Sequence, residues 1–453
     1  MRKLWFIIVL WGSKFGLLLC RLLGKNGTYI AGAFALRLQK DFITHFTHVD
    51  PEKTVFITGT NGKSTSNNLI VHALRDAGKK VTTNLEGANL ITGVATALIR
   101  DSSLLGRVNG DYLVFETDER YLAKIYEQLP AKTLCITNIQ KDQVQRNGEP
   151  DFIYKKIAKI VSPDMRIIAN NEEPRTLSLE DRAGSVITYG VARHSESFEK
   201  NGFYDVTMGC PKCGNKIAFQ YYNVDNVGPF RCTVCGFQSR IQPDVLLTDI
   251  DFENRTCRCG ETEIYLPYTQ PFFLYNYAMT IAVCEMFGVT AAQVSKSFRS
   301  FKNIAGRLEL IPYKTKQIKY IRIKQENPET LTTAFDFIAR DKSRKIFMIG
   351  LEQLEDFQPY YTNTFYTFDC NVDALMESNI EHCISFSEAV AYDTANRLIY
   401  GGFPEDRITV IPTDENKDIF AELDKHDCDN VYLITWLHKY EQMMEDLPKY
   451  EQH

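Results

Sequence analysis

The stretch VFITGTNGKSTSNNLIVHALRDAG, residues 55–78, constrains the fold of this chain more than any other segment. An apolar, β-rich run ends at Gly59, and apolar residues then recur at helical spacing until Gly78. This pattern predicts a strand, a glycine-rich loop and a helix. The usual phosphate loop, GxxxxGK[ST], would need glycine at position 57, where Ile57 stands. The sequence therefore predicts a shortened variant of that loop.

The chemistry of the predicted loop suits a nucleotide phosphate. A loop that opens a helix directs backbone N–H groups at an anion. Lys63 can reach the terminal phosphates, and the Ser64 hydroxyl can hold Mg²⁺. A plain glycine-rich turn is the alternative interpretation. On the phosphate interpretation, the residues that contact the nucleotide are Gly59, Thr60, Asn61, Gly62, Lys63, Ser64 and Thr65.

Two later segments, DYLVFETDERYL and KTLCITNIQKDQ, each show an apolar strand pattern that runs into polar residues. Open α/β sheets place ligand contacts at such strand ends. Glu116, Asp118 and Glu119 are candidate Mg²⁺ ligands, because carboxylate oxygens suit that ion. Asn138 and Asp142 are candidate polar contacts near the phosphates. Taken singly, each of these residues fits solvated surface better than a ligand contact. As a series after a phosphate loop, they favour a ligand site.

Four cysteines form two CxxC pairs, Cys210 with Cys213 in CPKCG and Cys232 with Cys235 in CTVCG. This spacing predicts a tetrahedral zinc site of four thiolates, in a ribbon at about residues 205–240. Structural zinc sites fill all four positions with protein ligands, so we expect a role in folding rather than in catalysis. The residues between the pairs carry few basic side chains, which argues against a nucleic-acid-binding ribbon.

Length and composition limit the remaining possibilities. A chain of 453 residues suggests roughly two to four domains. Its 12 cysteines are too sparse for a disulfide scaffold, and an ATP-type site points to the reducing cytoplasm. A net charge of −5 gives no general electrostatic reason to bind nucleic acid.

The N-terminus reads MRKLWFIIVLWGSKFGLLLCRLLGKNG, in which Lys14 and Arg21 interrupt the apolar runs. These charges argue against a clean transmembrane helix, which needs about 20 mostly apolar residues. Two alternatives stay open: an amphipathic helix lying on the inner face of the cell membrane, or a helix packed on the body of the protein.

Three segments in order, ITGTNGKST, FETDE and ITNIQKDQVQRNGE, resemble the central ATP-binding domain of the Mur ligase family, whose phosphate loop is the shortened variant. LYNYAMTIAVCEMFGV and IAGRLELI resemble two further elements of that family, which implies that Asn276 and Arg307 contact the nucleotide. The four-cysteine insertion narrows the resemblance to the MurT-type synthetase subunits of lipid II isoglutaminyl synthase.

The resemblance implies an α/β fold. It would comprise a Mur-ligase-type central P-loop ATPase domain with an inserted four-cysteine zinc ribbon, followed by a smaller Rossmann-like α/β C-terminal domain. The expected boundaries are an N-terminal helical segment at 1–48, the ATP-binding domain at 49–310 and the C-terminal domain at 311–453.

The resemblance also implies an activity: ATP-dependent amidation of the D-glutamate α-carboxylate in the lipid II stem peptide, through an acyl phosphate, during peptidoglycan synthesis. Lys63 and Glu116 would act at the phosphates, with Mg²⁺ held by Ser64, Glu116 and Glu119. Ammonia would come from a GatD-type glutaminase partner, whose catalytic histidine would be oriented by a carboxylate of this chain.

The resemblance weakens in the C-terminal third. The segment at 350–375 departs from the family pattern and keeps Asp356 and Asp369 in register, with Asn363 at one expected aspartate. Asp369 is the candidate for the partner's triad, and Asp356 is the second choice. Two other interpretations stay open: a drifted nucleotide-binding paralogue that acts as a regulatory partner, and a Mur-type or folylpolyglutamate-type amino-acid ligase.

Overall fold

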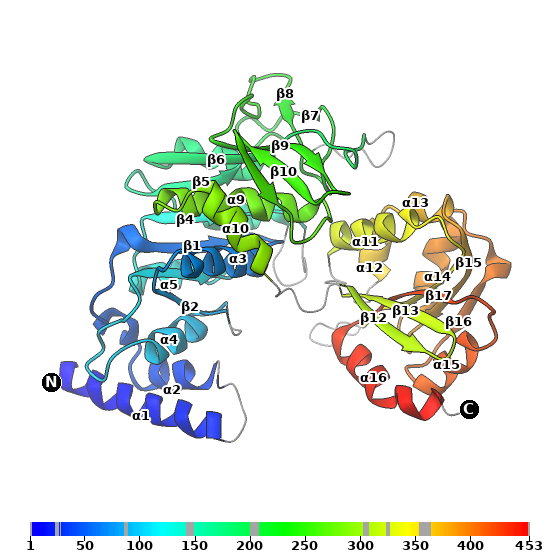
Figure 1. Cartoon of the computed structure of the whole chain (residues 1–453), viewed down its shortest axis with the longest axis horizontal. Coiled ribbons are helices and arrows are strands. Elements are labelled where there is room, and N and C mark those ends of the chain that lie inside the picture. Colours follow the sequence, from blue (N-terminus) through cyan, green and yellow to red (C-terminus); the bar gives the residue numbers. More distant parts are fainter. Residues whose placement is uncertain are drawn as a thin grey trace. The chain divides into compact units, whose positions relative to one another are not determined.

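The computed structural model describes residues 2–22, 27, 29–85, 89–141, 149–199, 208–301, 308–322, 327–352 and 364–451 (Figure 1). The chain divides into two compact units. The first comprises Met1–Gln140 and Asn147–Asn303, and the second comprises Lys141–Arg146 and Ile304–His453. Each unit is built on its own sheet.

The first unit is built on a nine-stranded sheet in the order β11-β10-β9-β6-β5-β4-β1-β3-β2. The seven strands from β2 to β9 in this order are parallel, and β10 and β11 continue the sheet antiparallel. The strands are β1 (Thr54–Thr58), β2 (Val81–Thr83), β3 (Tyr112–Glu116), β4 (Thr133–Ile136), β5 (Arg166–Asn170), β6 (Ser185–Val191), β9 (Val245–Asp251), β10 (Thr256–Cys259) and β11 (Thr262–Tyr265).

The helices of the first unit cover this sheet. Residues 273–284 of α9 are all buried, which explains why that segment is apolar on every side. Thr290 and Gln293 form a reciprocal capping box that starts α10. The helices are α3 (Lys63–Asp76), α4 (Ile91–Arg100), α5 (Leu122–Gln128), α7 (Pro150–Ala158), α8 (Pro174–Ser178), α9 (Phe272–Met286) and α10 (Ala291–Ser300), with short 3₁₀ turns η1 (Phe42–His45), η2 (Pro51–Lys53) and η3 (Leu179–Asp181).

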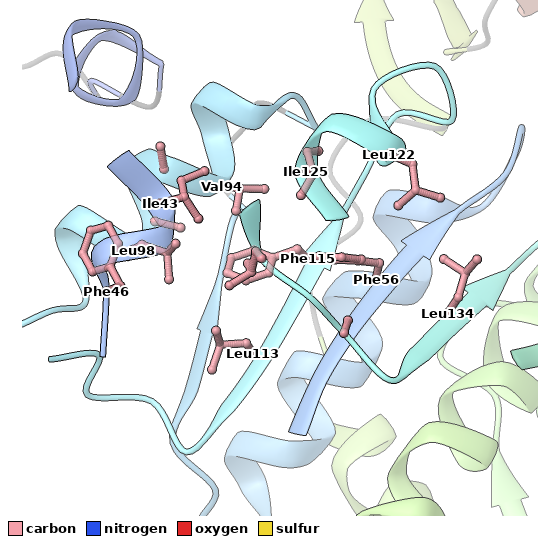
Figure 2. Close-up of a cluster of buried hydrophobic side chains, with 14 of the residues drawn as sticks. Ile43, Phe46, Phe56, Val94, Leu98, Leu113, Phe115, Leu122, Ile125 and Leu134 are labelled. Carbon is pink, nitrogen blue, oxygen red and sulfur yellow. The ribbon is translucent and has the colours of Figure 1, made fainter. Parts of the chain in front are cut away.

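The core on one side of the sheet joins the strands to the N-terminal segment. Figure 2 shows Phe56 of β1 and Phe115 of β3 beside Val94 of α4, with Ile43 and Phe46 of the η1 region at the same cluster. The N-terminal segment therefore shares its core with the strands that lead to the predicted phosphate loop.

The N-terminal helices α1 (Arg2–Leu22) and α2 (Ile30–Leu38) pack beside α4 (Figure 1). Phe6 and Leu10 of α1 are buried, and Lys14 donates hydrogen bonds to the carbonyl groups of Ile99 and Ser102. Burial lowers the pKa of Lys14. Among the described residues, Arg2–Cys20 is the one helical span that passes a test of length and apolar composition for crossing a membrane.

The cysteine-containing insertion forms a small two-stranded antiparallel sheet of β7 (Ile217–Phe219) and β8 (Phe230–Cys232). Its apolar core contains Ile217, Phe230 and Phe237, together with Leu177 of α8. The insertion therefore packs onto the first unit.

The second unit is built on a six-stranded sheet in the order β12-β13-β17-β14-β15-β16, in which only the β12–β13 pair is antiparallel among the described strands. Phe347 and Ile349 face one core cluster, and Ile346 and Met348 face the other, so β14 is covered on both sides. The strands are β12 (Leu308–Tyr313), β13 (Lys316–Ile321), β14 (Lys345–Gly350), β15 (Ile380–Phe386), β16 (Ile408–Ile411) and β17 (Asn430–Ile434).

Helices flank this second sheet. Asn327, which precedes Pro328, accepts a hydrogen bond from the backbone N–H of Thr330 at 3.0 Å and so caps α11. The helices are α11 (Pro328–Arg340), α12 (Thr364–Asp369), α13 (Asp373–Met376), α14 (Ala391–Tyr400), α15 (Asn416–Leu423) and α16 (Leu437–Glu451), with a 3₁₀ turn η5 (Glu405–Arg407). Both units thus have the α/β fold with parallel sheets that the sequence predicts.

Candidate nucleotide-binding site

The segment at 55–78 forms a strand, a loop and a helix: β1 ends at Thr58 and α3 begins at Lys63. Gly59 and Gly62 have positive φ angles of 122° and 84°. A Cβ atom on Gly59 would lie 2.3 Å from Thr137 Oγ1, and one on Gly62 would lie 2.5 Å from Asn276 Oδ1. Only glycine fits at these two positions, because both the backbone angle and the close neighbours exclude a side chain.

Asn138, at the end of β4, holds the loop in place. Its Oδ1 accepts from the Asn61 N–H at 3.0 Å, and its Nδ2 donates to the Asn61 carbonyl at 3.1 Å. The Asn138 carbonyl accepts from the Thr60 N–H at 2.8 Å. Gln140, which the sequence analysis did not single out, adds contacts to Thr60 and Asn61. Asn138 is therefore placed to shape the loop.

Lys63 is 7% exposed, and its ammonium group faces the loop. It donates to the Thr60 carbonyl at 3.1 Å and to the Gly59 carbonyl, and it lies 3.3 Å from Glu119 Oε2. Glu119 is 5% exposed, so this is a buried ion pair. A bound terminal phosphate would compete with Glu119 for the ammonium group, since both are anions close to one cation.

The acidic residues at the end of β3 differ in their partners. Asp118 makes a two-point ion pair with Arg120, at 2.8 and 3.0 Å. Burial opposes ionisation of Asp118, but the hydrogen bonds from Arg120 hold its pKa below the ordinary value. Asn84 Nδ2 donates a hydrogen bond to the Glu116 carbonyl at 2.9 Å, and Asn84 Oδ1 accepts one from the Glu116 N–H at 3.0 Å. These two bonds fix the position of the end of β3. Glu116 and Glu119 remain the carboxylates that could hold Mg²⁺ here.

Ser64 is exposed in the first turn of α3, and Thr65 behind it is buried. Asn276 on α9 reaches the same turn, where its Oδ1 accepts from the Ser66 hydroxyl at 3.2 Å. The fold thus brings Asn276 against the loop from a position far along the chain. Two other predicted contacts, Asp142 and Arg307, lie outside the described residues.

A buried carboxylate that was not among the predicted site residues is Glu172, which follows β5 and is 2% exposed. Its carboxylate accepts from the Val191 N–H at 2.7 Å, from Asn223 Nδ2 at 3.0 Å and from the Tyr275 hydroxyl. Burial raises the pKa of Glu172 to about 7, although these hydrogen bonds favour the charged form.

Glu172 connects the insertion to the helix that carries Asn276. Asn223 belongs to the loop between β7 and β8, and Tyr275 directly precedes Asn276 on α9. The signal in the sequence was the acidic pair in NNEEP immediately after a buried strand. That signal identifies a strand end, but it does not reveal the two distant partners.

The four cysteines of the two CxxC pairs lie together in the insertion. Their sulfur atoms lie within 4.8 Å of one another, with 3.7 Å between Cys210 and Cys235 and 3.6 Å between Cys213 and Cys232. Four sulfurs at about 2.3 Å from a tetrahedral Zn²⁺ would be separated by about 3.8 Å. The donor set and its spacing therefore fit zinc.

Asp369 ends α12 in the second unit, and its exposed carboxylate pairs with Lys141 at 2.7 Å. The other two residues considered for the partner's triad, Asp356 and Asn363, lie outside the described residues. The structure therefore places one of the three candidates, and it places that one on an accessible surface.

Two protein families match separate parts of this chain. The Mur ligase middle domain matches residues 57–222, which include the predicted phosphate loop, both strand ends and residues 205–222 of the predicted zinc ribbon at 205–240. The MurT ligase C-terminal family matches residues 325–443, in the second unit.

Individual relatives extend these matches over most of the chain. The lipid II isoglutaminyl synthase (glutamine-hydrolyzing) subunit MurT of Staphylococcus aureus (strain COL) is 25% identical over 366 residues, which are 80% of this chain and 81% of that protein. The MurT subunit of Streptococcus pneumoniae (strain ATCC BAA-255 / R6) is 24% identical over 91% of this chain and 90% of its own.

A solved structure shares the fold. The pseudomurein peptide ligase type C from Methanothermus fervidus superposes with a TM-score of 0.68 at 17% identity, over 90% of this chain and 80% of that chain. At this identity the likeness concerns the arrangement of helices and strands.

Proposed function

Because this chain belongs to the Mur ligase family of ATP-dependent ligases, and resembles its MurT-type members, we propose that it is the synthetase subunit of a lipid II isoglutaminyl synthase. Its reaction would amidate the α-carboxylate of D-glutamate in the lipid II stem peptide to give D-isoglutamine. The observation that carries the proposal is a Mur-type phosphate loop and a MurT-type C-terminal region in the same chain.

The chemistry of the site suits such a reaction. A carboxylate is a poor electrophile, so transfer of the terminal phosphoryl group of ATP to it creates an acyl phosphate with a good leaving group. Ammonia then attacks the acyl carbon and phosphate leaves with the acyl C–O bond broken. The new nitrogen loses one proton, which the departing phosphate can take up, to give the amide. Lys63 supplies positive charge where the phosphoryl group is transferred.

Several other residues would position the phosphates and Mg²⁺ for phosphoryl transfer. The backbone N–H groups at the start of α3 face the phosphates, and Asn138 and Asn276 hold the loop that presents them. Ser64, Glu116 and Glu119 would hold Mg²⁺, which neutralises phosphate charge when bound. Arg307 is proposed as a further nucleotide contact by resemblance alone.

The four cysteines hold a structural zinc ion in this proposal. All four coordination positions are filled by thiolates, which leaves no position for a reacting water molecule. Cys232 also belongs to the small apolar core of the insertion, which suits a role in folding.

Ammonia would come from a GatD-type glutaminase, and Asp369 would orient the partner's catalytic histidine as the third member of its triad. Its exposure at the end of α12 leaves the carboxylate accessible to a partner. Loss of its ion pair with Lys141 should cost little stability, because exposed pairs contribute about 0–1 kcal/mol.

The test is to co-express the chain with its cognate glutaminase and to compare glutamine-driven with ammonia-driven amidation of lipid II. We expect Asp369→Asn to lose glutamine-driven amidation by about 100-fold while ammonia-driven amidation stays within about twofold. Asp373→Asn, an exposed aspartate in the first turn of α13, is the matched control and should leave both rates unchanged.

The alternatives predict other results in this assay. Equal glutamine-driven rates in wild type and Asp369→Asn would remove Asp369 from the triad. ATP binding without amidation from either nitrogen source would identify a regulatory paralogue. Incorporation of an amino acid in place of ammonia would identify an amino-acid ligase.

The exposed face of α1 supports a location at the inner face of the cell membrane, where a lipid-linked substrate resides. One face packs on the body of the protein, and the other exposes large apolar side chains, which suits a helix lying in the membrane interface. Arg2 and Lys3 at its start add charge that favours anionic lipid. The exposed side chains are Leu4, Trp5, Ile8, Trp11, Phe15, Leu18, Leu19 and Leu22.

We expect the purified protein to sediment with vesicles of anionic phospholipid, and Phe15→Glu to reduce the bound fraction at least about tenfold. Phe15 is 61% exposed, so a charge there removes apolar contact with lipid without disturbing the core. The control is Ile241→Glu, since Ile241, which follows the insertion, is 90% exposed. Wild-type protein that stays in the supernatant would contradict a membrane-bound α1.

A further inference from the structure

A second cluster of metal-binding side chain types lies in the second unit, far in sequence from the four cysteines. His382 is in β15, Glu422 is in the last turn of α15, and His426 follows that helix. One potential ligand atom from each of the three residues lies within 4.8 Å of the others. The two imidazole rings stack with centroids 4.1 Å apart, so the two histidines lie side by side.

The contact between His426 and Glu422 has the spacing of two ligands on one ion. His426 Nε2 lies 3.4 Å from Glu422 Oε1. This nitrogen is buried and has no hydrogen-bond partner among the residues that the structure describes. Two ligand atoms at about 2.1 Å from a tetrahedral ion are separated by about 3.4 Å. A metal ion could therefore bind this nitrogen and the Glu422 oxygen together.

Neighbouring groups orient the carboxylate toward the histidines. Lys425 donates to Glu422 Oε2 at 2.7 Å, and Thr409 of β16 donates to Glu422 Oε1 at 3.0 Å. The Thr409 hydroxyl also lies 2.8 Å from His382 Nε2. Such outer contacts are typical of metal sites, where they fix the orientation of the ligands. If this nitrogen bound a metal ion, it would give up its contact with Thr409.

We propose that His382, Glu422 and His426 form a second metal site, which takes a divalent transition ion such as Zn²⁺. Two neutral imidazoles and one carboxylate match the ligand preference of that ion. The ion joins α15 to β15 next to β16, the strand at one edge of the sheet, and thereby stabilises that edge. With three protein ligands, the fourth position is left to a water molecule.

The test is Co²⁺ titration of the full-length protein after removal of bound metal, with absorption spectroscopy. The four-cysteine site gives strong thiolate-to-cobalt charge-transfer bands, whereas a site of two histidines and a glutamate gives only weak d–d bands. We expect one equivalent with charge-transfer bands and a second equivalent without them. His426→Gln and Glu422→Gln should each lose the second equivalent and keep the first.

His438→Gln is the control, because His438 is 75% exposed on α16 and should leave both equivalents in place. If the variants fail to fold, protection of His382 and His426 from diethyl pyrocarbonate by Zn²⁺ in the wild-type protein replaces them. Absence of an equivalent with d–d bands alone overturns the proposal, as does its persistence in folded His426→Gln or a lack of protection. None of these readouts depends on amidation activity.

Discussion

Replacement of Lys63 by alanine should lower ATP turnover and amidation by about 100-fold or more, because the variant lacks the cation at the transferred phosphoryl group. The Lys63 ammonium is held at the loop by two carbonyl groups, so its position is set before the nucleotide binds. The measurement is the rate of phosphate release and of lipid II amidation with saturating ammonia. Unchanged rates would refute the assignment of the phosphate loop.

The buried pair with Glu119 determines how this experiment must be controlled. Removal of Lys63 alone leaves a buried carboxylate without its partner, which destabilises a protein by several kcal/mol in typical cases. The double variant Lys63→Ala with Glu119→Gln removes both charges and should recover melting temperature without recovering turnover. Lys80→Ala, at an exposed lysine, controls for the loss of a positive charge.

Substitution of one of the four cysteines of the CxxC pairs should also have a large effect, on zinc content and on thermal stability. We expect about one zinc ion per chain at this site, and we expect Cys232→Ser to remove it and to lower the melting temperature by at least about 5 °C. Cys232 lies in the small core of the insertion together with Phe230 and Ile217, so loss of the ion should also loosen these side chains. Metal analysis and calorimetry of the same samples make the measurement.

Cys259→Ser serves as the control, because Cys259 is a partly buried thiol in β10, outside both CxxC pairs. It should retain the zinc ion of the insertion and the wild-type melting temperature within about 2 °C. A Cys232→Ser protein that melts at the wild-type temperature would show that the insertion folds without a metal.

The features that the sequence predicted best are local ones. The strand, loop and helix at 55–78 could be predicted from the sequence, because the spacing of apolar residues and two glycines, all close along the chain, determine this local geometry. The two CxxC pairs could also be identified from the sequence, because one tight turn brings the two cysteines of each pair close together. Gly214 and Gly236, which follow the two pairs, have positive φ angles of 76° that suit such turns. The α/β class followed from strands that alternate with helices.

The sequence was less informative where a residue's role depends on its partners. The sequence named Glu116 and Glu119 as Mg²⁺ ligands, but it did not show that Asp118 pairs with Arg120 or that Glu119 pairs with Lys63. Lys14 looked like an interruption of an apolar helix, yet it bonds two carbonyl groups of the body. Such pairings depend on side-chain directions in the folded chain, which apolar spacing does not contain.

The sequence by itself therefore determined the strand, glycine-rich loop and helix at 55–78, the cysteine spacing and the α/β class, since each rests on interactions among residues close along the chain. Only the tertiary structure decided that Asn276 touches Gly62, that Glu172 joins Asn223 to Tyr275, and that His382 meets Glu422 and His426. The physical reason is that these contacts form only when helices pack on the sheets. Their geometry comes from the packing of whole elements, and no short stretch of sequence encodes it.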